Sequence, residues 1–259
     1  MKFQDILYEK KDGVAKITIN RPQAYNAFTT NTLKEVGQAL ADAELDSKVG
    51  VVVVTGAGDK AFCTGGDLKE AAQPEGYNKE MGYWHADVHR RIRTIPKPVI
   101  AAVNGYAIGG GHILHLICDL TIASENARFG QAGPKVGSFD AGFGVTYLAR
   151  VVGEKKAREI WFLCRQYTAQ EALEMGLVNK VVPQDKLEEE VDRWCQEILL
   201  LAPTALKFCK LSFNADTDHM FGFEAWSENA TRMFWTSKEA EEAKTAFKEK
   251  RKPDFSQFR

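Results

Sequence analysis

The sequence has no excess of charge of either sign, no long apolar run and no regular array of cysteines. Its 34 lysines and arginines are balanced by 35 aspartates and glutamates, which argues against the broad cationic surface that nucleic acids and anionic membranes attract. No apolar run approaches the length of a membrane span, and residues 1–20 carry charges throughout, with no stretch that resembles a signal peptide. We therefore expect a cytoplasmic protein that binds neither nucleic acid nor membranes.

The cysteines and histidines predict neither a disulfide framework nor a metal site. The five cysteines are odd in number and scattered along the chain, as is typical of reduced thiols. None of them lies at the spacing of a metal-binding motif. The five histidines include pairs that are three or four residues apart, but no pair forms the helix motif of a zinc hydrolase.

The order of apolar patterns predicts an α/β fold with one main domain. The predicted strands cover residues 6–10, 14–19, 51–54 and 99–103. Asp12 and Gly13 suit a hairpin turn between the first two strands, and the β-branched run of the third is typical of a strand covered by helices on both faces. Residues 30–45 have helical spacing, the chain from about residue 143 onward is mostly helical by pattern, and a further helix is expected to begin near Pro203.

Two glycine-rich turns carry the chemistry that the sequence predicts. Residues 63–67 (Cys-Thr-Gly-Gly-Asp) and 108–112 (Ile-Gly-Gly-Gly-His) each follow an apolar segment and precede a helix-like run. Each turn can therefore direct an unpaired backbone N–H into one pocket, and two such donors form an oxyanion hole. Residues 73–84 are polar, contain glycine and border the first turn, so they read as a mobile loop that can act as a lid.

The order and spacing of these motifs resemble the crotonase superfamily of enoyl-CoA hydratases and isomerases over nearly the whole chain. The segments that carry the resemblance are residues 26–28 (Asn-Ala-Phe), 61–67, 96–98 (Pro-Lys-Pro) and 104–111. Within the superfamily, the sequence is most similar to 1,4-dihydroxy-2-naphthoyl-CoA synthases and their relatives, the 2-ketocyclohexanecarboxyl-CoA hydrolases. This finer similarity rests on residues 129–131 (Phe-Gly-Gln), 133–140 and 248–255.

The resemblance implies an α/β crotonase spiral of ββα units, an acyl-CoA substrate and a homo-oligomer, either a trimer or a dimer of trimers. It implies that residues 1–200 form the spiral core with the acyl-CoA site, and that residues 201–259 form a helical region that packs on the core or on a neighbouring subunit. It also implies that the N–H groups of Gly66 and Gly110 bind the thioester oxygen and stabilise an enolate. Coenzyme A enters as part of the substrate, and we expect no tightly bound cofactor.

Two positions argue against simple hydration of an enoyl-CoA. Hydratases of the superfamily place one catalytic glutamate three residues after the second oxyanion-hole glycine and another about twenty residues further on. This sequence has Ile113 and Gly133 at those positions, and neither residue can transfer a proton.

Asp140, Ser138 and Tyr77 are the candidate proton-transfer residues. By resemblance to the naphthoyl-CoA synthases, Asp140 and Ser138 lie beside the reacting ring carbon, and Tyr77 assists proton transfer and orients the substrate. A carboxylate in an apolar pocket exchanges protons near neutral pH, which suits Asp140 to the role of base. The alternatives are that Asp140 caps a helix beginning near Phe143 and that Tyr77 packs on the surface of its loop.

The resemblance also assigns a set of residues to the substrate pocket, and some of them depart from the synthase pattern. These residues are Leu68, Gln131, Ala132, Gly133, Trp161 and Trp235. Gln131, Gly133 and Trp161 match positions that hold a bicarbonate ion in synthases without a carboxylate base, although a tryptophan such as Trp161, taken alone, is more often a core residue. Ala132 replaces a threonine that contacts this ion, which removes one hydrogen bond, so the sequence leaves bicarbonate binding open.

The replacement of polar by apolar groups in the pocket favours ring cleavage. Trp235 stands where synthases have a tyrosine that reaches into the neighbouring subunit's site, and Leu68 stands where they have a glutamine. We therefore expect a hydrolase that opens the ring of an alicyclic β-keto acyl-CoA by a retro-Claisen step, with Asp140 as the base. The close alternative is a 1,4-dihydroxy-2-naphthoyl-CoA synthase, which condenses o-succinylbenzoyl-CoA. An enoyl-CoA hydratase and a non-catalytic scaffold of the same fold are the further alternatives.

The phosphates of coenzyme A need local cations. Lys69, just past the first glycine turn, and the C-terminal residues Lys244, Lys250 and Arg251 are candidates by family position. The alternative for the last three is a solvated basic face, which is common near a chain end.

Overall fold

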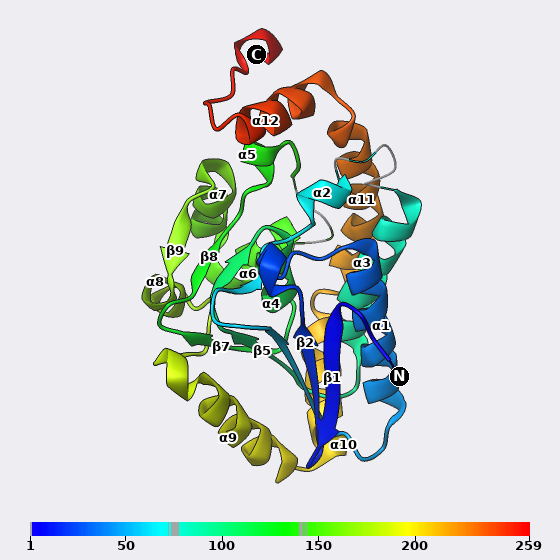
Figure 1. The fold of residues 1–259 in the computed structure, drawn as a ribbon. Helices are drawn as coiled ribbons and strands as arrows, with labels where there is room; N and C mark the ends of the chain where they lie inside the picture. Colours follow the sequence, from blue (N-terminus) through cyan, green and yellow to red (C-terminus); the bar gives the residue numbers. More distant parts are fainter. Residues whose placement is uncertain (1, 72, 74–77, 140–141, 143) are drawn as a thin grey trace.

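The computed structural model describes residues 2–71, 73, 78–139, 142 and 144–259, which form two sheets with helices packed around them (Figure 1). Within these residues the larger sheet has the strand order β1-β2-β3-β5-β7-β10 and the smaller has β4-β6-β8-β9. The strands of the larger sheet are β1 (Ile6–Lys11), β2 (Val14–Ile19), β3 (Val51–Gly56), β5 (Val99–Val103), β7 (Leu120–Ser124) and β10 (Lys180–Val182). Those of the smaller sheet are β4 (Ala61–Cys63), β6 (Tyr106–Ile108), β8 (Arg128–Gly130) and β9 (Gln166–Thr168).

Successive strand pairs contribute one strand to each sheet, which builds the predicted spiral of ββα units. The pairs β3 and β4, β5 and β6, and β7 and β8 follow this rule, and the corresponding strands of successive pairs are parallel. Helices α2 (Leu68–Ala71) and α3 (Lys79–Thr94) follow β4, and α4 (Gly110–Leu116) follows β6. The two glycine turns therefore leave neighbouring strands of the smaller sheet.

The N-terminal hairpin and the first long helix confirm the sequence prediction. Strands β1 and β2 pair antiparallel around Asp12 and Gly13, whose φ angles of 49° and 83° are those of a tight hairpin turn. Helix α1 (Thr30–Leu45) is capped by Thr29, whose side chain accepts a hydrogen bond from the amide of Thr32.

Strand β3 is covered on both faces, as its β-branched run predicts. Val52 and Val54 belong to the main apolar core. Val51 and Val53 face the other way, into a second cluster formed with helix α9 (Leu187–Leu199). Figure 1 shows α9 on the side of the larger sheet opposite α1 and α3. This arrangement explains why residues 51–54 of the strand are all valine.

The prediction of a loop over residues 73–84 is wrong for residues 79–84, which form the first turns of α3. Asn78 caps this helix, because its Oδ1 accepts a hydrogen bond from the amide of Met81 at 2.9 Å. The apolar side chains of Met81 and Val88 are buried against the core, which outweighs the low helix propensity of Gly82. Residues 74–77 lie outside the described residues.

The helices after residue 130 pack on the two sheets and on α3. They are α5 (Gly133–Val136), α6 (Gly144–Val152), α7 (Glu154–Leu163), α8 (Ala169–Glu174), α10 (Pro203–Ala215), α11 (Gly222–Trp235) and α12 (Lys238–Lys248), besides α9. Helices α10 and α11 contact α3, and α12 contacts α5. The region after residue 201 therefore packs on the core of its own chain.

No single described helix is long and apolar enough to cross a membrane. Two helical segments joined by a bend of 106°, Gln184–Leu199 and Pro203–Ala215, are long and apolar enough only when taken together. All five cysteines are free thiols, and four of them are buried.

Candidate active site

The two glycine turns predicted to carry the chemistry lie against each other. Gly65 has a φ of +85° and Gly109 has a φ of +57°, so both turns need the left-handed backbone that glycine adopts without strain. A Cβ atom added to Gly65 would lie 3.0 Å from the amide nitrogen of Gly110. Because β4 and β6 are neighbouring parallel strands, their ends bring the two turns together at one edge of the smaller sheet.

The amides of Gly66 and Gly110 have no hydrogen-bond acceptor among the described residues, whereas their neighbours do. The amide of Asp67 donates to the carbonyl of Phe28 at 2.8 Å, and that of Gly109 donates to the carbonyl of Gly130 at 3.0 Å. Gly110 is the first residue of α4, where the helix itself leaves the N–H without an acceptor. Both N–H groups are therefore available to an external oxygen atom.

The ring of Phe28 lies against both turns. A Cβ atom added to Gly110 would lie 2.8 Å from the Cε1 and Cζ atoms of this ring, closer than real side chains approach. A Cβ atom added to Gly66 would lie 3.7 Å from Cε2, at ordinary contact distance. Phe28 is 7% exposed, so the ring has little room to move away. The site therefore requires glycine more strictly at position 110 than at position 66.

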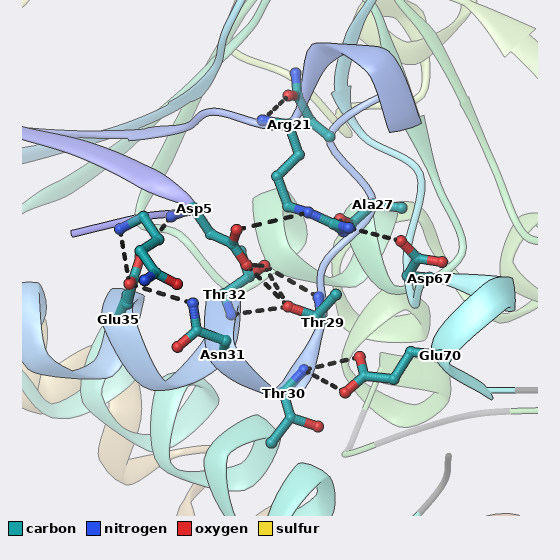
Figure 2. A network of polar contacts seen from close by, with 12 residues as sticks. Asp5, Arg21, Ala27, Thr29, Thr30, Asn31, Thr32, Glu35, Asp67 and Glu70 are labelled. Atoms are coloured by element: carbon teal, nitrogen blue, oxygen red, sulfur yellow. Dashed lines mark hydrogen bonds and ion pairs between the residues drawn. The ribbon is translucent and has the colours of Figure 1, made fainter. Parts of the chain in front are cut away.

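An ion pair fixes the first turn to the N-terminal part of the chain. Figure 2 shows Arg21 between Asp5 and Asp67, and its guanidinium lies 2.8 Å from Oδ2 of Asp67. Arg21 also donates to the carbonyl of Ala27. Burial raises the pKa of Asp67, but the bonds from Arg21 and from the amide of Lys69 outweigh it, so the net pKa lies below its usual range.

Helix α2 presents two of the predicted site residues to solvent. Leu68 is 44% exposed, and Lys69 is exposed with no carboxylate paired to its ammonium group among the described residues. Glu70 holds the helix in place by accepting a hydrogen bond from the amide of Thr30 at 3.0 Å (Figure 2). This contact joins α2 to the start of α1 and leaves the Lys69 cation available.

The two positions that hold glutamates in hydratases carry no acid in this chain. Ile113 is 2% exposed and belongs to the main apolar core. A Cβ atom added to Gly133 would lie 3.0 Å from the Cα atom of Phe139, so a side chain there needs this neighbour to shift by a few tenths of an ångström. Neither residue carries a carboxylate.

Gln131 lies in a neutral, buried environment. Its amide nitrogen donates to Nδ1 of His112 at 3.1 Å. Burial lowers the pKa of His112 to about 3, so the imidazole is neutral and can accept this bond. His112 is on α4, directly after the second glycine turn.

Trp161 lies on α7, and Ala132 and Ser138 flank the short helix α5. Ala132 precedes this helix and Ser138 follows it, with the amide of Ser138 donating to the carbonyl of Gly133 at 2.9 Å. Trp161, on α7, is 5% exposed, and its indole N–H has no acceptor in the described part of the chain. A buried donor of this kind is unusual and suits an external anion or carbonyl oxygen.

Trp235 and Lys244 form a stacked pair at the end of α5. The Lys244 ammonium lies 4.3 Å from the centre of the Trp235 ring and donates to the Trp235 carbonyl at 2.7 Å. A Cβ atom added to Gly137 would lie 3.1 Å from Cγ of Lys244, so the lysine stem rests on the residue before Ser138. Burial lowers the pKa of Lys244. The structure thus brings Trp235 to the segment that carries the candidate site.

The last two predicted coenzyme A cations are exposed near the C-terminus. Arg251 is paired with Glu242 at 2.6 Å and with Glu249 at 2.7 Å, which balances its charge within the chain. Lys250, beside it, is exposed and has a φ of 56°. Tyr77 and Asp140, the predicted proton-transfer residues, lie outside the described residues.

The sequence interpretation missed several residues that lie beside the site. Arg21 had no motif to mark it, and its role follows only from the fold. His85 and His89 form one of the histidine pairs, four residues apart, but their partners, Glu224 and Glu228, come more than 130 residues later in the chain. Nothing in the local sequence connects the two pairs.

The fold agrees with that of known proteins. The family model described as enoyl-CoA hydratase/isomerase matches residues 9–258. An enoyl-CoA hydratase from Mycobacterium avium subsp. paratuberculosis is 32% identical, with a TM-score of 0.89 over 98% of this chain and 99% of that one. A carnitinyl-CoA hydratase from Mycobacterium avium is 37% identical, with a TM-score of 0.87 over 99% and 100% of the two chains. An enoyl-CoA hydratase/isomerase from Xanthobacter autotrophicus is also 37% identical, with a TM-score of 0.83 over 96% and 93%.

Proposed function

The chain belongs to the enoyl-CoA hydratase/isomerase family of crotonase-fold acyl-CoA enzymes, and we propose that it cleaves a ring carbon–carbon bond in an alicyclic β-keto acyl-CoA. In this proposal the thioester oxygen accepts hydrogen bonds from the N–H groups of Gly66 and Gly110. These bonds stabilise the enolate that forms when the ring bond breaks. The contact between the two glycine turns supports this role, because it holds both donors at one place.

The observation that carries the choice of reaction is the absence of an acid at both hydratase positions. Addition of water to an enoyl-CoA needs one group to activate water and another to deliver a proton to the α-carbon. Ile113 is apolar and buried, and Gly133 has no side chain and lies close to Phe139. A reaction that uses one base elsewhere in the pocket fits these residues better.

The proposed reaction balances as a hydrolysis. Asp140 takes a proton from water, and the water oxygen forms a bond to the carbon of the ring ketone. The bond between this carbon and the α-carbon then breaks, and its electron pair forms the thioester enolate held by the two amides. Protonation of the α-carbon, with the proton returned by Asp140, gives an open-chain acid that is still a coenzyme A thioester. Ser138, two residues before Asp140 in the sequence, is proposed to hydrogen-bond the ketone oxygen.

Two other functions have specific support. The similarity of residues 129–131 and 133–140 to 1,4-dihydroxy-2-naphthoyl-CoA synthases favours a ring-forming Claisen condensation of o-succinylbenzoyl-CoA. In that case a bicarbonate ion near Gln131 and Trp161 is proposed as the base, and the indole N–H of Trp161 is a donor for it. The hydratase names of the solved relatives favour hydration instead.

Three substrates separate these functions. The purified protein is incubated in turn with 2-ketocyclohexanecarboxyl-CoA, o-succinylbenzoyl-CoA and crotonyl-CoA, and the products are followed by mass spectrometry. We expect only the first to react, gaining one water and a new carboxylate. Loss of water from o-succinylbenzoyl-CoA without any ring-opened acid would identify a synthase and overturn the proposal.

The same assay tests the proposed base. We expect Asp140→Asn to lose the ring-opening activity while the circular dichroism spectrum stays that of the wild type. Asp254→Asn changes an exposed aspartate near the C-terminus and serves as the matched control. Full activity in Asp140→Asn would remove this residue from the reaction.

We further propose that the protein is a homo-oligomer, a trimer or a dimer of trimers. Large apolar side chains on α10 and α11 are exposed in the single chain, including Phe208, Phe213, Trp226 and Met233. Exposed apolar side chains gathered on neighbouring helices are typical of a surface that another subunit covers. Light scattering coupled to gel filtration measures the number of chains directly, and a monomer at micromolar concentration would contradict this assembly.

A further inference from the structure

Two histidines of α3 and two glutamates of α11 meet in the interior of the molecule. Nδ1 of His85 lies 2.8 Å from Oε1 of Glu228, and Nδ1 of His89 lies 3.3 Å from Oε1 of Glu224. The two imidazole rings are 4.0 Å apart between centres. Each pair is spaced by four residues, so each helix directs two ligand atoms from one face toward the other helix.

This His-Glu cluster is buried, and a glycine backbone packs closely against it. His85 is 3% exposed and His89 is 2% exposed, while the side chains of Glu224 and Glu228 are each 12% exposed. A Cβ atom added to Gly142 would lie 2.6 Å from Nδ1 of His89. The backbone therefore comes as close to the cluster here as a residue without a side chain permits.

A second glycine makes the same kind of approach from α3. A Cβ atom added to Gly82 would lie 3.0 Å from Oε2 of Glu228. On the other side, the ring of Phe28, which lies against both glycine turns, is 5.7 Å from the ring of His85 between centres. The cluster is thus separated from the candidate active site by one aromatic side chain.

From this arrangement we propose that His85, His89 and Glu224 bind a divalent transition-metal ion, for which zinc is the best match. The ligand atoms of these three residues all lie within 4.8 Å of one another. A zinc ion with bonds of about 2.0–2.2 Å needs its ligands roughly 3.5 Å apart, so small side-chain rotations complete the site. Two imidazoles and one carboxylate are a common ligand set for zinc and for non-haem iron.

Glu228 completes the site from outside the three ligands. A carboxylate bonded to one nitrogen of a ligating histidine orients the ring and raises its affinity for the metal. Carboxylates are rarely buried unless they are paired or bind a metal, and the two of this cluster are each paired with a histidine that can also bind a metal. The ion links α3 to α11 and lies next to Gly142, in the segment that follows Ser138.

A cleft gives an ion a route to the cluster. Its volume is about 310 Å³, and it lies between α3 and α11. Glu228 and Gly82 are both part of its wall. Glu228 is the acidic residue of this wall, which also holds Lys79 and Arg232. Divalent metals that prefer imidazole, such as Zn²⁺ and Co²⁺, are expected to bind, whereas Mg²⁺, which prefers oxygen ligands and keeps its waters, is not.

The test uses the full-length protein without a histidine tag, stripped of metal with a chelator. Co²⁺ is titrated by visible absorption and Zn²⁺ by displacement of Co²⁺, with Mg²⁺ as a negative control. We expect one Co²⁺ per chain, and X-ray absorption of the Zn²⁺ form should show two imidazole nitrogens. Binding of less than one ion per chain at high micromolar Co²⁺, or a metal shell without imidazole, would overturn the proposal.

Variants locate the site. His89→Gln and Glu224→Gln are each expected to weaken Co²⁺ binding more than about 100-fold. This exceeds the loss that follows when a residue that only hydrogen-bonds a metal ligand is changed. His219→Gln and Cys209→Ser change exposed residues elsewhere and should bind as the wild type does. Equal affinity in His89→Gln and the wild type would place the metal elsewhere. Circular dichroism checks folding, and the wild-type absorption spectrum decides the matter if a variant fails to fold.

Discussion

Gly110 is needed both for its backbone N–H and for its lack of a side chain. Its amide is the first of α4, and an added Cβ would lie 2.8 Å from the Phe28 ring. Gly110→Ala adds this Cβ but keeps the N–H, whereas Gly110→Pro adds it and removes the N–H at a helix position that tolerates proline. We expect kcat to be about 10²–10³ lower in Gly110→Pro than in Gly110→Ala. Similar kcat values in the two folded variants would show that this N–H takes no part.

Lys69 provides an exposed cation at a position fixed by Glu70. If it binds a coenzyme A phosphate, its contact is the same in the ground state and the transition state. We therefore expect Lys69→Ala to raise KM several-fold with little change in kcat. Lys207→Ala, an exposed lysine on α10, is the control and should leave KM unchanged. An unchanged KM in Lys69→Ala would remove this residue from the site.

At the residue scale, the sequence identified the glycines but not their neighbours. The conformations of Gly65 and Gly109 follow from the turn motifs, because only glycine adopts them freely. The contact of Lys244 with Trp235 does not follow from the sequence, since two side chains nine positions apart meet only because α11 and α12 turn back on each other. The ion pair that balances Arg251 was missed for the same reason.

At the element scale, the bond between Arg21 and Asp67 ties the first glycine turn to the N-terminal segment. The folded pKa of Asp67 is lowered, so its charge stabilises the fold above the unfolded pKa of about 3.9 and ceases to do so as pH falls through the folded value. We expect Asp67→Asn to be less stable than the wild type at pH 7. This difference should shrink steadily below about pH 4.

Urea denaturation at several pH values measures this difference as the free energy of unfolding. Asp59→Asn changes an exposed aspartate on a turn and is the control, for which we expect a much smaller effect at pH 7. A destabilisation by Asp67→Asn that is equally large at pH 7 and pH 3 would show that the lost contact is not the charge pair.

Most elements could be predicted because their patterns are strong. The β-branched strand β3 and helix α1 begin where the sequence indicates. The start of α3 was missed because residues 73–84 as a whole contain many polar residues and two glycines, and the burial of Met81 that stabilises this turn depends on packing against other elements. Tertiary contacts, rather than local preference, decide such segments.

At the scale of the whole molecule, Lys210 ties the C-terminal helices to the core. It is 7% exposed and donates to the carbonyls of Ile92 and Lys97 and to Oδ2 of Asp119, at 2.6–3.0 Å. We expect Lys210→Met to lower the free energy of unfolding by about 1–3 kcal/mol, because it leaves the two carbonyls without this donor and Asp119 with only the amide of Val99. Lys207→Met on the same helix is exposed and should have little effect. Equal stability of the two variants in urea would contradict this role.

The overall spiral could be predicted from its motifs, whereas the contacts between distant helices could not. The order of the glycine turns and strands indicates one known architecture, and the fold agrees with it. The His-Glu cluster needs α11 to lie along α3, and no spacing within either helix indicates the other. Proton transfer by Asp140 and Tyr77 stays a prediction, because both residues lie outside the described part of the chain.

The most direct test is a crystal structure of the protein with a bound coenzyme A thioester. The measured quantities are the distances from the thioester oxygen to the amide nitrogens of Gly66 and Gly110. We predict that both lie between about 2.7 and 3.1 Å. A thioester oxygen that contacts neither amide, or amides that donate to other protein groups in the complex, would contradict the proposed stabilisation of the enolate.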